Sequence, residues 1–216
     1  MIEQLSEAQL AEIEAVTLGH YSENADSFWQ GTRDHDVSQN YAALLDCFPK
    51  SQPLDILDLG CGPGRDLKYF QSMGHRPVGL DGSAAFCEMA RAHAGCKVLH
   101  QQFLSLSLPD STFNAIFANA SLFHVPRQAL PNVFGQLNAT LITGGILFIS
   151  NPRGNGEGWQ GERFGNFMEY DTTKAYLEGA GFKLLKHYYR PEGMHRDAQP
   201  WLATVSQKAE ASSSAS

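Results

Sequence analysis

Short runs of consecutive apolar residues alternate with helical patterns from about residue 54 onward. Such runs are typical of strands buried on both faces, as in a parallel sheet covered by helices on each side. We therefore expect five core strands, at residues 54–59, 77–80, 96–103, 113–119 and 145–150. Helical patterns lie between them at residues 65–73, 84–94 and 130–141, and Ser83 is well placed to cap the second of these helices.

The last third of the chain changes character. It predicts a helix at residues 172–179, capped by Asp171, and two strands at residues 182–189 and 201–207. Alternation in the final strand is typical of an antiparallel or edge element. The expected fold class is α/β, a Rossmann-like three-layer sandwich whose mostly parallel seven-stranded sheet ends in an antiparallel strand. A dinucleotide-binding fold would instead finish with another strand–helix–strand repeat.

Three regions are expected along the chain. Residues 1–50 predict an N-terminal helical lid or cap, in which Ser38 caps a helix over residues 39–47 and residues 31–37 cover the site. Residues 51–208 form the α/β domain, and the small polar residues of 209–216 predict a disordered tail.

Composition narrows the class of partner. The net charge is -7, with 16 basic and 23 acidic residues, which does not favour a nucleic acid. The 4 cysteines have no zinc-ligand spacing, so no metal site is expected. No apolar run is long enough to span a bilayer, and the acidic N-terminus is unlike a signal peptide. We therefore expect a cytoplasmic protein without a membrane partner.

A glycine-rich loop, GCGPG at residues 60–64, follows the first strand. Glycines let the backbone turn tightly and approach a ligand closely. A strand, a glycine loop and a helix suit NAD, FAD or S-adenosylmethionine, but dinucleotide sites favour GxGxxG and this loop is GxGxG. The second signal is Asp81, which ends the second strand about 20 residues further on and could accept hydrogen bonds from ribose hydroxyls. It could also be a turn residue of Asp-Gly-Ser.

Four segments in a consistent order resemble the class I, seven-strand S-adenosylmethionine-dependent methyltransferase superfamily, in particular its small-molecule branch. These segments are LDLGCGPGRD at 57–66, VGLDGS at 78–83, FNAIFANASLFHVP at 113–126 and TGGILFISNP at 143–152. The resemblance covers roughly residues 20–208 and implies that residues 51–208 are a class I methyltransferase domain. It also implies S-adenosylmethionine as cofactor, S-adenosylhomocysteine as product, and no metal.

The resemblance assigns roles to residues at the carboxyl ends of the strands. The methionine end of the cofactor would lie against the glycine loop, the ribose against the end of the second strand, and the adenine after the third. Gln102 stands where the superfamily usually has an acidic residue, and its carbonyl could accept the same hydrogen bond. The implied cofactor residues are Tyr21, Asp58, Gly60, Cys61, Gly62, Gly64, Asp81, Gly82, Gln102, Phe103, Asn119 and Ala120.

Catalytic and substrate residues are expected in the loops around the same strand ends. His124, after the fourth strand, could act as a general base or pack over the cofactor, and His35 lies in the expected lid. Arg33, Arg153, Trp159 and Arg190 are the candidate substrate contacts. Exposed charges and internal ion pairs are the alternative interpretation of Arg33 and Arg153, and the rim of a dimer interface is the alternative for Arg190.

The sequence thus predicts an enzyme that transfers a methyl group to a nitrogen, oxygen or sulfur atom of a small molecule, possibly an acidic or zwitterionic metabolite. An RNA or protein methyltransferase, a nicotinamide oxidoreductase and a non-catalytic cofactor-binding module are the alternatives. The sequence leaves open whether the protein is a monomer or a homodimer.

Overall fold

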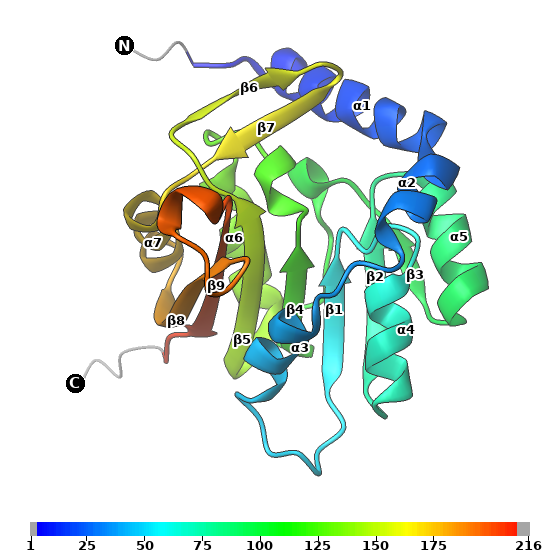
Figure 1. Ribbon diagram of the computed structural model, residues 1–216, viewed down its shortest axis with the longest axis vertical. Coiled ribbons are helices and arrows are strands. Elements are labelled where there is room, and N and C mark those ends of the chain that lie inside the picture. Colours follow the sequence, from blue (N-terminus) through cyan, green and yellow to red (C-terminus); the bar gives the residue numbers. More distant parts are fainter. Residues whose placement is uncertain (1–3, 211–216) are drawn as a thin grey trace.

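A seven-stranded sheet forms the centre of the computed structural model, which describes residues 4–210 (Figure 1). Its strand order is β3-β2-β1-β4-β5-β9-β8. The strands are β1 (Asp55–Leu59), β2 (Arg76–Asp81), β3 (Val98–His100), β4 (Phe113–Asn119), β5 (Leu141–Pro152), β8 (Phe182–Arg190) and β9 (Trp201–Lys208). Strands β1 to β5 pair in parallel, whereas β9 is antiparallel to both β5 and β8. The predicted fold class is confirmed.

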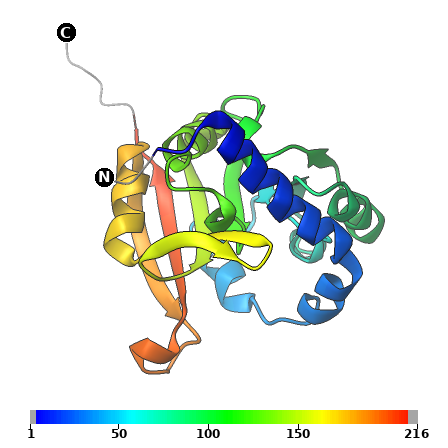
Figure 2. The same ribbon diagram turned by 90° about the horizontal axis from the view of Figure 1, so that it is seen from above.

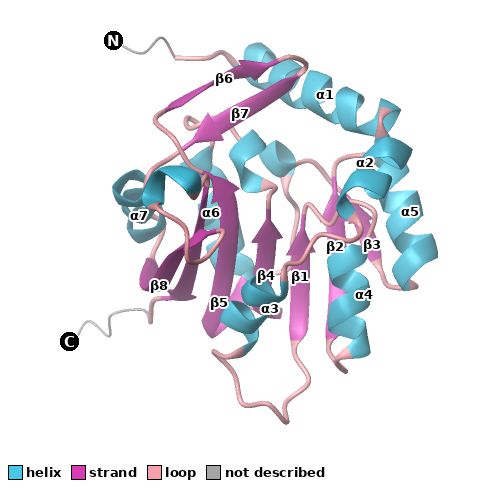
Figure 3. Cartoon of the chain, viewed as in Figure 1, coloured by secondary structure: helices cyan, strands magenta, loops and turns pink. Residues whose placement is uncertain are grey.

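Helices cover both faces of this sheet, which makes three layers (Figure 3). One face packs against α3 (Ser38–Leu45) and α4 (Arg65–Ser72), and the other against α6 (Leu130–Thr140) and α7 (Tyr170–Gly179). The fifth helix, α5 (Ala84–Ala94), packs beside α4 and against β2 and β3. Because α3 belongs to the core of the sheet, the predicted N-terminal cap is partly built into the domain.

The two-sided burial of the strands follows from their sequence. Ile56 and Phe117 point to the face that α3 and α4 cover, while Leu57 and Ile116 point to the face that α6 covers. All four side chains have no exposed surface, as expected for strands with apolar residues at consecutive positions.

Several local predictions need correction. Ser83 caps α5 as predicted, but Val37 rather than Ser38 is the N-cap of α3, because the Val37 carbonyl accepts the first helical hydrogen bonds, from Asn40 and Tyr41. Glu169 is the N-cap of α7, and Asp171 lies in the first turn of that helix. The third strand is also shorter than predicted, since Phe103–Ser105 forms a 3-10 turn.

A roof lies above the carboxyl ends of the strands. It consists of α1 (Glu7–Glu23), α2 (Ala25–Thr32) and an antiparallel hairpin of β6 (Gly156–Gln160) and β7 (Arg163–Phe167). The hairpin runs beside α1 in both views (Figures 1 and 2). The sequence predicts only a long loop here. These residues are mostly polar or glycine, so the sequence shows no alternation of apolar and polar positions. Within residues 4–210 the two strands pair only with each other, and the hairpin packs against α1.

Two sequence predictions concern regions beyond the domain. Most of the tail predicted as disordered lies outside the described residues, and its first residues, 209 and 210, are exposed and outside any helix or strand. Within residues 4–210, no helix combines the length and the apolar character that crossing a membrane requires.

Candidate functional site

A cavity of about 600 Å³ lies between the roof and the carboxyl ends of β1, β2 and β4. This is the edge of the sheet at which open α/β folds bind ligands, and the volume lies in the range of small-molecule sites. The walls are mostly apolar, with a few convergent polar groups. Residues from α1, α2, the β1–α4 loop, β2, β4 and the hairpin all contribute to them.

The glycine loop forms the floor of this cavity, and its glycines serve different purposes. Gly60 has φ +73°, and a Cβ at this position would collide with the Cβ of Ser121. The Gly62 backbone, at φ +51°, donates to Asp81 Oδ2 over 2.9 Å and has only Phe28 near the place of a Cβ. Gly64 lies outside the cavity walls and lets α4 pack against Ala90. Cys61 also lines the cavity.

Asp81 presents a buried carboxylate at the cavity wall. Its Oδ2 accepts from the Gly62 backbone, and its Oδ1 accepts from the Ser83 backbone over 2.8 Å. Burial raises the pKa of Asp81 to about 6, although these backbone donors favour the charged form. Each carboxylate oxygen has a further lone pair, so the group can still accept hydrogen bonds from a ligand.

The wall next to Asp81 is built to receive a flat apolar group. Phe86 of α5, Phe103 and Leu18 of α1 line it, and Gly82 and Gln102 lie in the same wall. The side chain of Gln102 is exposed, so its amide is available to a ligand. Asn119 and Ala120 complete the floor at the end of β4, where Ala120 has the uncommon φ of +61°.

Asp58 does not reach the cavity wall. It is 1% exposed, and its Oδ2 has no hydrogen-bond partner among the described residues. Burial raises the pKa of this carboxyl well above its usual range, and the charges of Asp66 and Asp81 raise it further. The residue therefore does not face the cavity directly.

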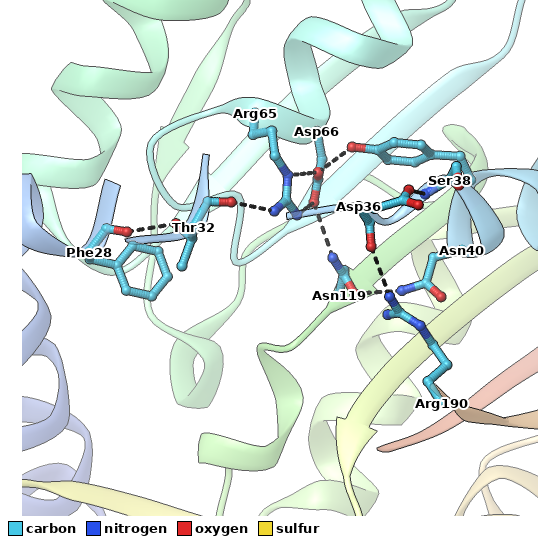
Figure 4. Close-up of polar contacts among 10 residues, drawn as sticks. Phe28, Thr32, Asp36, Ser38, Asn40, Arg65, Asp66, Asn119 and Arg190 are labelled. Carbon is cyan, nitrogen blue, oxygen red and sulfur yellow. Dashed lines mark hydrogen bonds and ion pairs between the residues drawn. The ribbon is translucent and has the colours of Figure 1, made fainter. Parts of the chain in front are cut away.

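A polar network joins the floor to the roof (Figure 4). Arg65 donates to both oxygens of Asp66, over 2.7 and 3.0 Å, and to the Thr32 carbonyl at the end of α2. The Tyr41 hydroxyl donates to Asp66 over 2.6 Å, and burial beside this carboxylate raises the pKa of Tyr41. Asn119 also donates to Asp66. The network fixes the side chains of Arg65, Asp66 and Asn119 at the cavity wall.

A second polar chain crosses the other side of the cavity. His124 Nδ1 lies 2.6 Å from the Phe164 carbonyl of β7, and its Nε2 lies 2.8 Å from the Tyr21 hydroxyl of α1. Burial lowers the pKa of His124 to about 4, and the nearby charge of Arg163 lowers it further. His124 is therefore uncharged near neutral pH, and both of its ring nitrogens have partners.

Two other predicted residues line the cavity mouth. His35 is exposed there, and Arg190 donates to the Asp36 carbonyl over 3.0 Å (Figure 4). No carboxylate forms an ion pair with Arg190 within the described part of the chain. Its guanidinium therefore keeps donors for a ligand.

Three predicted substrate residues are not brought to the cavity. Arg33 is exposed and pairs with its neighbour Asp34. Arg153 donates to the Glu169 carboxylate and to the carbonyls of residues 196 and 199, which occupies its fork of donors. Trp159 is 47% exposed on the hairpin. The alternative interpretation, an exposed charge or an internal ion pair, fits both arginines.

Of one whole wall, sequence reasoning found only Tyr21. Glu14, Thr17, Leu18 and Tyr21 follow helical spacing and line the cavity from one face of α1. Their spacing could have indicated this wall, since the four residues recur at i, i+3, i+4 and i+7 and therefore share one face of a helix. Arg65 and Asp66 also went unassigned, although both end the quoted glycine motif.

Comparison with known proteins agrees with this geometry. Residues 56–145 match a family described as a methyltransferase domain. The malonyl-[acyl-carrier protein] O-methyltransferase of Pectobacterium atrosepticum is 30% identical over 48% of this chain and 41% of its own length. The trans-aconitate 2-methyltransferase of Methylobacterium radiotolerans is 33% identical over 56% of this chain and 47% of its own. The chain thus spans somewhat less than half the length of these curated relatives.

A solved structure resembles almost the whole chain. The 1,6-didemethyltoxoflavin-N1-methyltransferase of Burkholderia thailandensis, with 1,6-didemethyltoxoflavin and S-adenosylhomocysteine bound, superimposes with a TM-score of 0.77. It is 20% identical, and the match covers 97% of this chain and 94% of that one. At this identity the likeness concerns the fold.

The cofactor that this fold implies is S-adenosylmethionine, and the cavity fits its parts. The Gly62 backbone faces the space without a side chain, the buried Asp81 carboxylate suits ribose hydroxyls, and the aromatic wall suits a flat base. The fold expected from the sequence motifs is thus confirmed: the chain has the Rossmann-like fold of the class I methyltransferases, and its residues 56–145 match the methyltransferase domain family.

Proposed function

We propose that this protein is an S-adenosylmethionine-dependent methyltransferase that methylates a nitrogen, oxygen or sulfur atom of a small molecule. The observation that carries the proposal is the position of Asp81. Its buried carboxylate holds the glycine loop through Gly62 and at the same time faces the cavity. S-adenosylmethionine supplies a methyl group already activated on a sulfonium. The protein then needs mainly to hold the acceptor close to that group in a dry site.

Each side of the cavity has a task in this proposal. The floor, with the backbone of Gly60 and Gly62, supports the methionine end, and Asp81 accepts from the ribose. Phe86 and Phe103 take the adenine between apolar surfaces. The roof excludes water, because α1 and the hairpin lie over the strand ends.

The charges at the mouth favour an acidic or zwitterionic acceptor. Arg190 and Arg163 both line the cavity, and neither forms an ion pair with a carboxylate within residues 4–210. A guanidinium binds a carboxylate or phosphate through paired donors. The relatives named above act on different acceptors, one of them borne by a carrier protein, so their names do not select one. The roof over the cavity favours a small acceptor over a macromolecule.

Titration calorimetry with S-adenosylhomocysteine tests the cofactor part of the proposal. Asp81→Asn should weaken binding by roughly ten- to a hundredfold, because a charged hydrogen-bond acceptor is lost. Asp110→Asn, a change at an exposed aspartate outside the cavity walls, is the matched control and should leave the affinity unchanged. Absence of binding to the unaltered protein would refute the proposal.

Transfer itself is tested with methyl-labelled S-adenosylmethionine and a cell extract separated by size. Label in the small-molecule fraction is the expected result. Label retained on RNA or protein would support the macromolecular alternative, and binding without any transfer would support a non-catalytic module.

A further inference from the structure

The hydroxyl group of Tyr21 has a fixed hydrogen-bond direction at the cavity wall. Tyr21 belongs to α1, and its hydroxyl lies 2.8 Å from His124 Nε2. Either atom of such a pair can donate, because the histidine tautomer decides the direction. The tautomer therefore determines, together with the Arg163 guanidinium that also faces this hydroxyl, what Tyr21 can offer to a ligand.

A carbonyl of the hairpin determines which tautomer His124 adopts. His124 Nδ1 lies 2.6 Å from the Phe164 carbonyl, which can only accept, so Nδ1 carries a proton. A neutral imidazole then has a lone pair on Nε2, and the Tyr21 hydroxyl must donate to it. Burial holds the pKa of His124 down at about 4, and the charges of Arg163 on β7 and His20 on α1 act in the same direction. The imidazole thus stays neutral over the physiological range.

The position of Tyr21 relates this hydroxyl to the reacting part of the site. The ring contacts Phe28 of α2 and Phe86 of α5 at centroid distances of 5.5 and 5.8 Å. Its partner His124 lies in the short 3-10 turn that follows β4 and its cavity residues Asn119 and Ala120. Tyr21 therefore lies between the proposed ribose side and the end of β4.

We propose that the Tyr21 oxygen, whose only proton is committed to His124, accepts a hydrogen bond from the atom that receives the methyl group. The inference rests on the proposed function and specifies its substrate class. The methyl-accepting atom bears hydrogen, as in an amine, a hydroxyl or a thiol, whereas a carboxylate oxygen would find no donor in Tyr21. His124 is a positioning residue in this arrangement, and the Phe164 carbonyl couples it to the hairpin.

Sinefungin is a suitable probe, because an amine-bearing carbon in this molecule replaces the methyl-bearing sulfonium of the cofactor. Its amine therefore presents N–H donors where the methyl group would lie, and S-adenosylhomocysteine has no group there. The readout is the ratio of the two dissociation constants in titration calorimetry. The unaltered protein should prefer sinefungin over S-adenosylhomocysteine.

Tyr21→Phe should reduce this preference, the ratio of the two dissociation constants, about tenfold. His124→Phe should also reduce it, because the Tyr21 hydroxyl is then no longer held with its lone pairs toward the cavity. Tyr69→Phe is the matched control, since Tyr69 stacks on Tyr41 outside the cavity walls. The preference should be unchanged in this variant.

The outcomes separate the two proposals. If S-adenosylhomocysteine binds and Tyr21→Phe retains the full preference for sinefungin, the role of Tyr21 is overturned and the proposed function stands. If the unaltered protein binds neither molecule, both proposals fail together. Retained binding of S-adenosylhomocysteine shows that each variant is folded, so a lost preference in either variant supports the inference.

Discussion

The floor and the roof of the cavity are held in place by different means. The floor consists of the ends of β1, β2 and β4 with the glycine loop, where the backbones of Gly60 and Cys61 both donate to the Leu80 carbonyl. The roof consists of α1, α2 and the β6–β7 hairpin. It is attached through side chains, such as the Thr17 hydroxyl that accepts from the Phe164 backbone. The floor is thus held by backbone hydrogen bonds, and the roof by side-chain hydrogen bonds to the residues beneath it, such as those from Arg65 to the Thr32 carbonyl and from Arg127 to the Phe167 carbonyl.

This difference suggests how the two regions divide the work. Backbone hydrogen bonds and buried side chains keep the floor in one geometry, as binding a cofactor requires. Contacts made by partly exposed side chains open more easily than the backbone hydrogen bonds of the core. We therefore expect ligands to enter and leave through the roof, and the following predictions compare the two regions, from the largest expected effect to the smallest.

The largest effect is expected in the floor, for Gly60→Ala. The new Cβ would collide with Ser121, and φ at this position is +73°. We expect the free energy of unfolding to fall by roughly 3 kcal/mol, measured by chemical denaturation. Gly19→Ala in α1 is the control, since no atom lies within 4 Å of its new Cβ and alanine favours a helix. If the two variants have the same free energy of unfolding, the floor is not packed more tightly than the roof.

The next largest loss of stability is expected in the polar network that joins the floor to the roof. Asp66→Asn leaves the guanidinium of Arg65 without its charged partner, where the two side chains are only 23% and 10% exposed. We expect the free energy of unfolding to fall by about 2 kcal/mol. Asp55→Asn breaks the exposed pair with Arg76 and should cost much less, because water screens that pair. Equal losses would show that burial does not distinguish the two pairs.

The floor should also make cofactor binding depend on pH. The carboxylate form of Asp81 accepts hydrogen bonds, and burial raises its pKa to about 6. Affinity for S-adenosylhomocysteine should be full above this pH and fall as the pH drops through 6, approaching about a tenfold loss at pH 5. Asp81→Asn should bind weakly at every pH, with a flat profile from pH 5 to 7. A sloping profile in that variant would assign the dependence to another group.

The smallest effect is expected in the roof. Glu162 at the hairpin turn lies 3.1 Å from His20 of α1, and the glutamate side chain is 72% exposed. Glu162→Gln should destabilise the contact by at most about 1 kcal/mol and accelerate hydrogen exchange of the Phe164 amide up to about fivefold. Glu12→Gln, an exposed position on the same helix, should change nothing. Faster exchange in the sheet as well would mean that roof and floor open together.

The fold and the floor could be predicted because their signals are local. Apolar residues occupy consecutive positions in β1 and β4, at 56–57 and at 115–118, and a strand with such a run can bury it only between two layers. The glycine loop and Asp81 could be predicted for the same reason, because each is recognised from the few residues around it. Ser83 and Gly95 also bound α5 as the sequence indicates, through a side-chain cap and a left-handed C-cap.

The roof and the pairing of its charges could only be decided by tertiary structure. Nothing near Arg153 in the sequence says that Glu169 and two distant carbonyls will occupy it, nor that Arg190 will keep free donors. His124 and Tyr21 are separated by 103 residues, and the Phe164 carbonyl that sets their hydrogen bonds lies on a hairpin that the sequence does not reveal. Strands and turns follow from interactions between neighbours along the chain. The direction of a hydrogen bond in the site depends on groups that only the folded chain brings together.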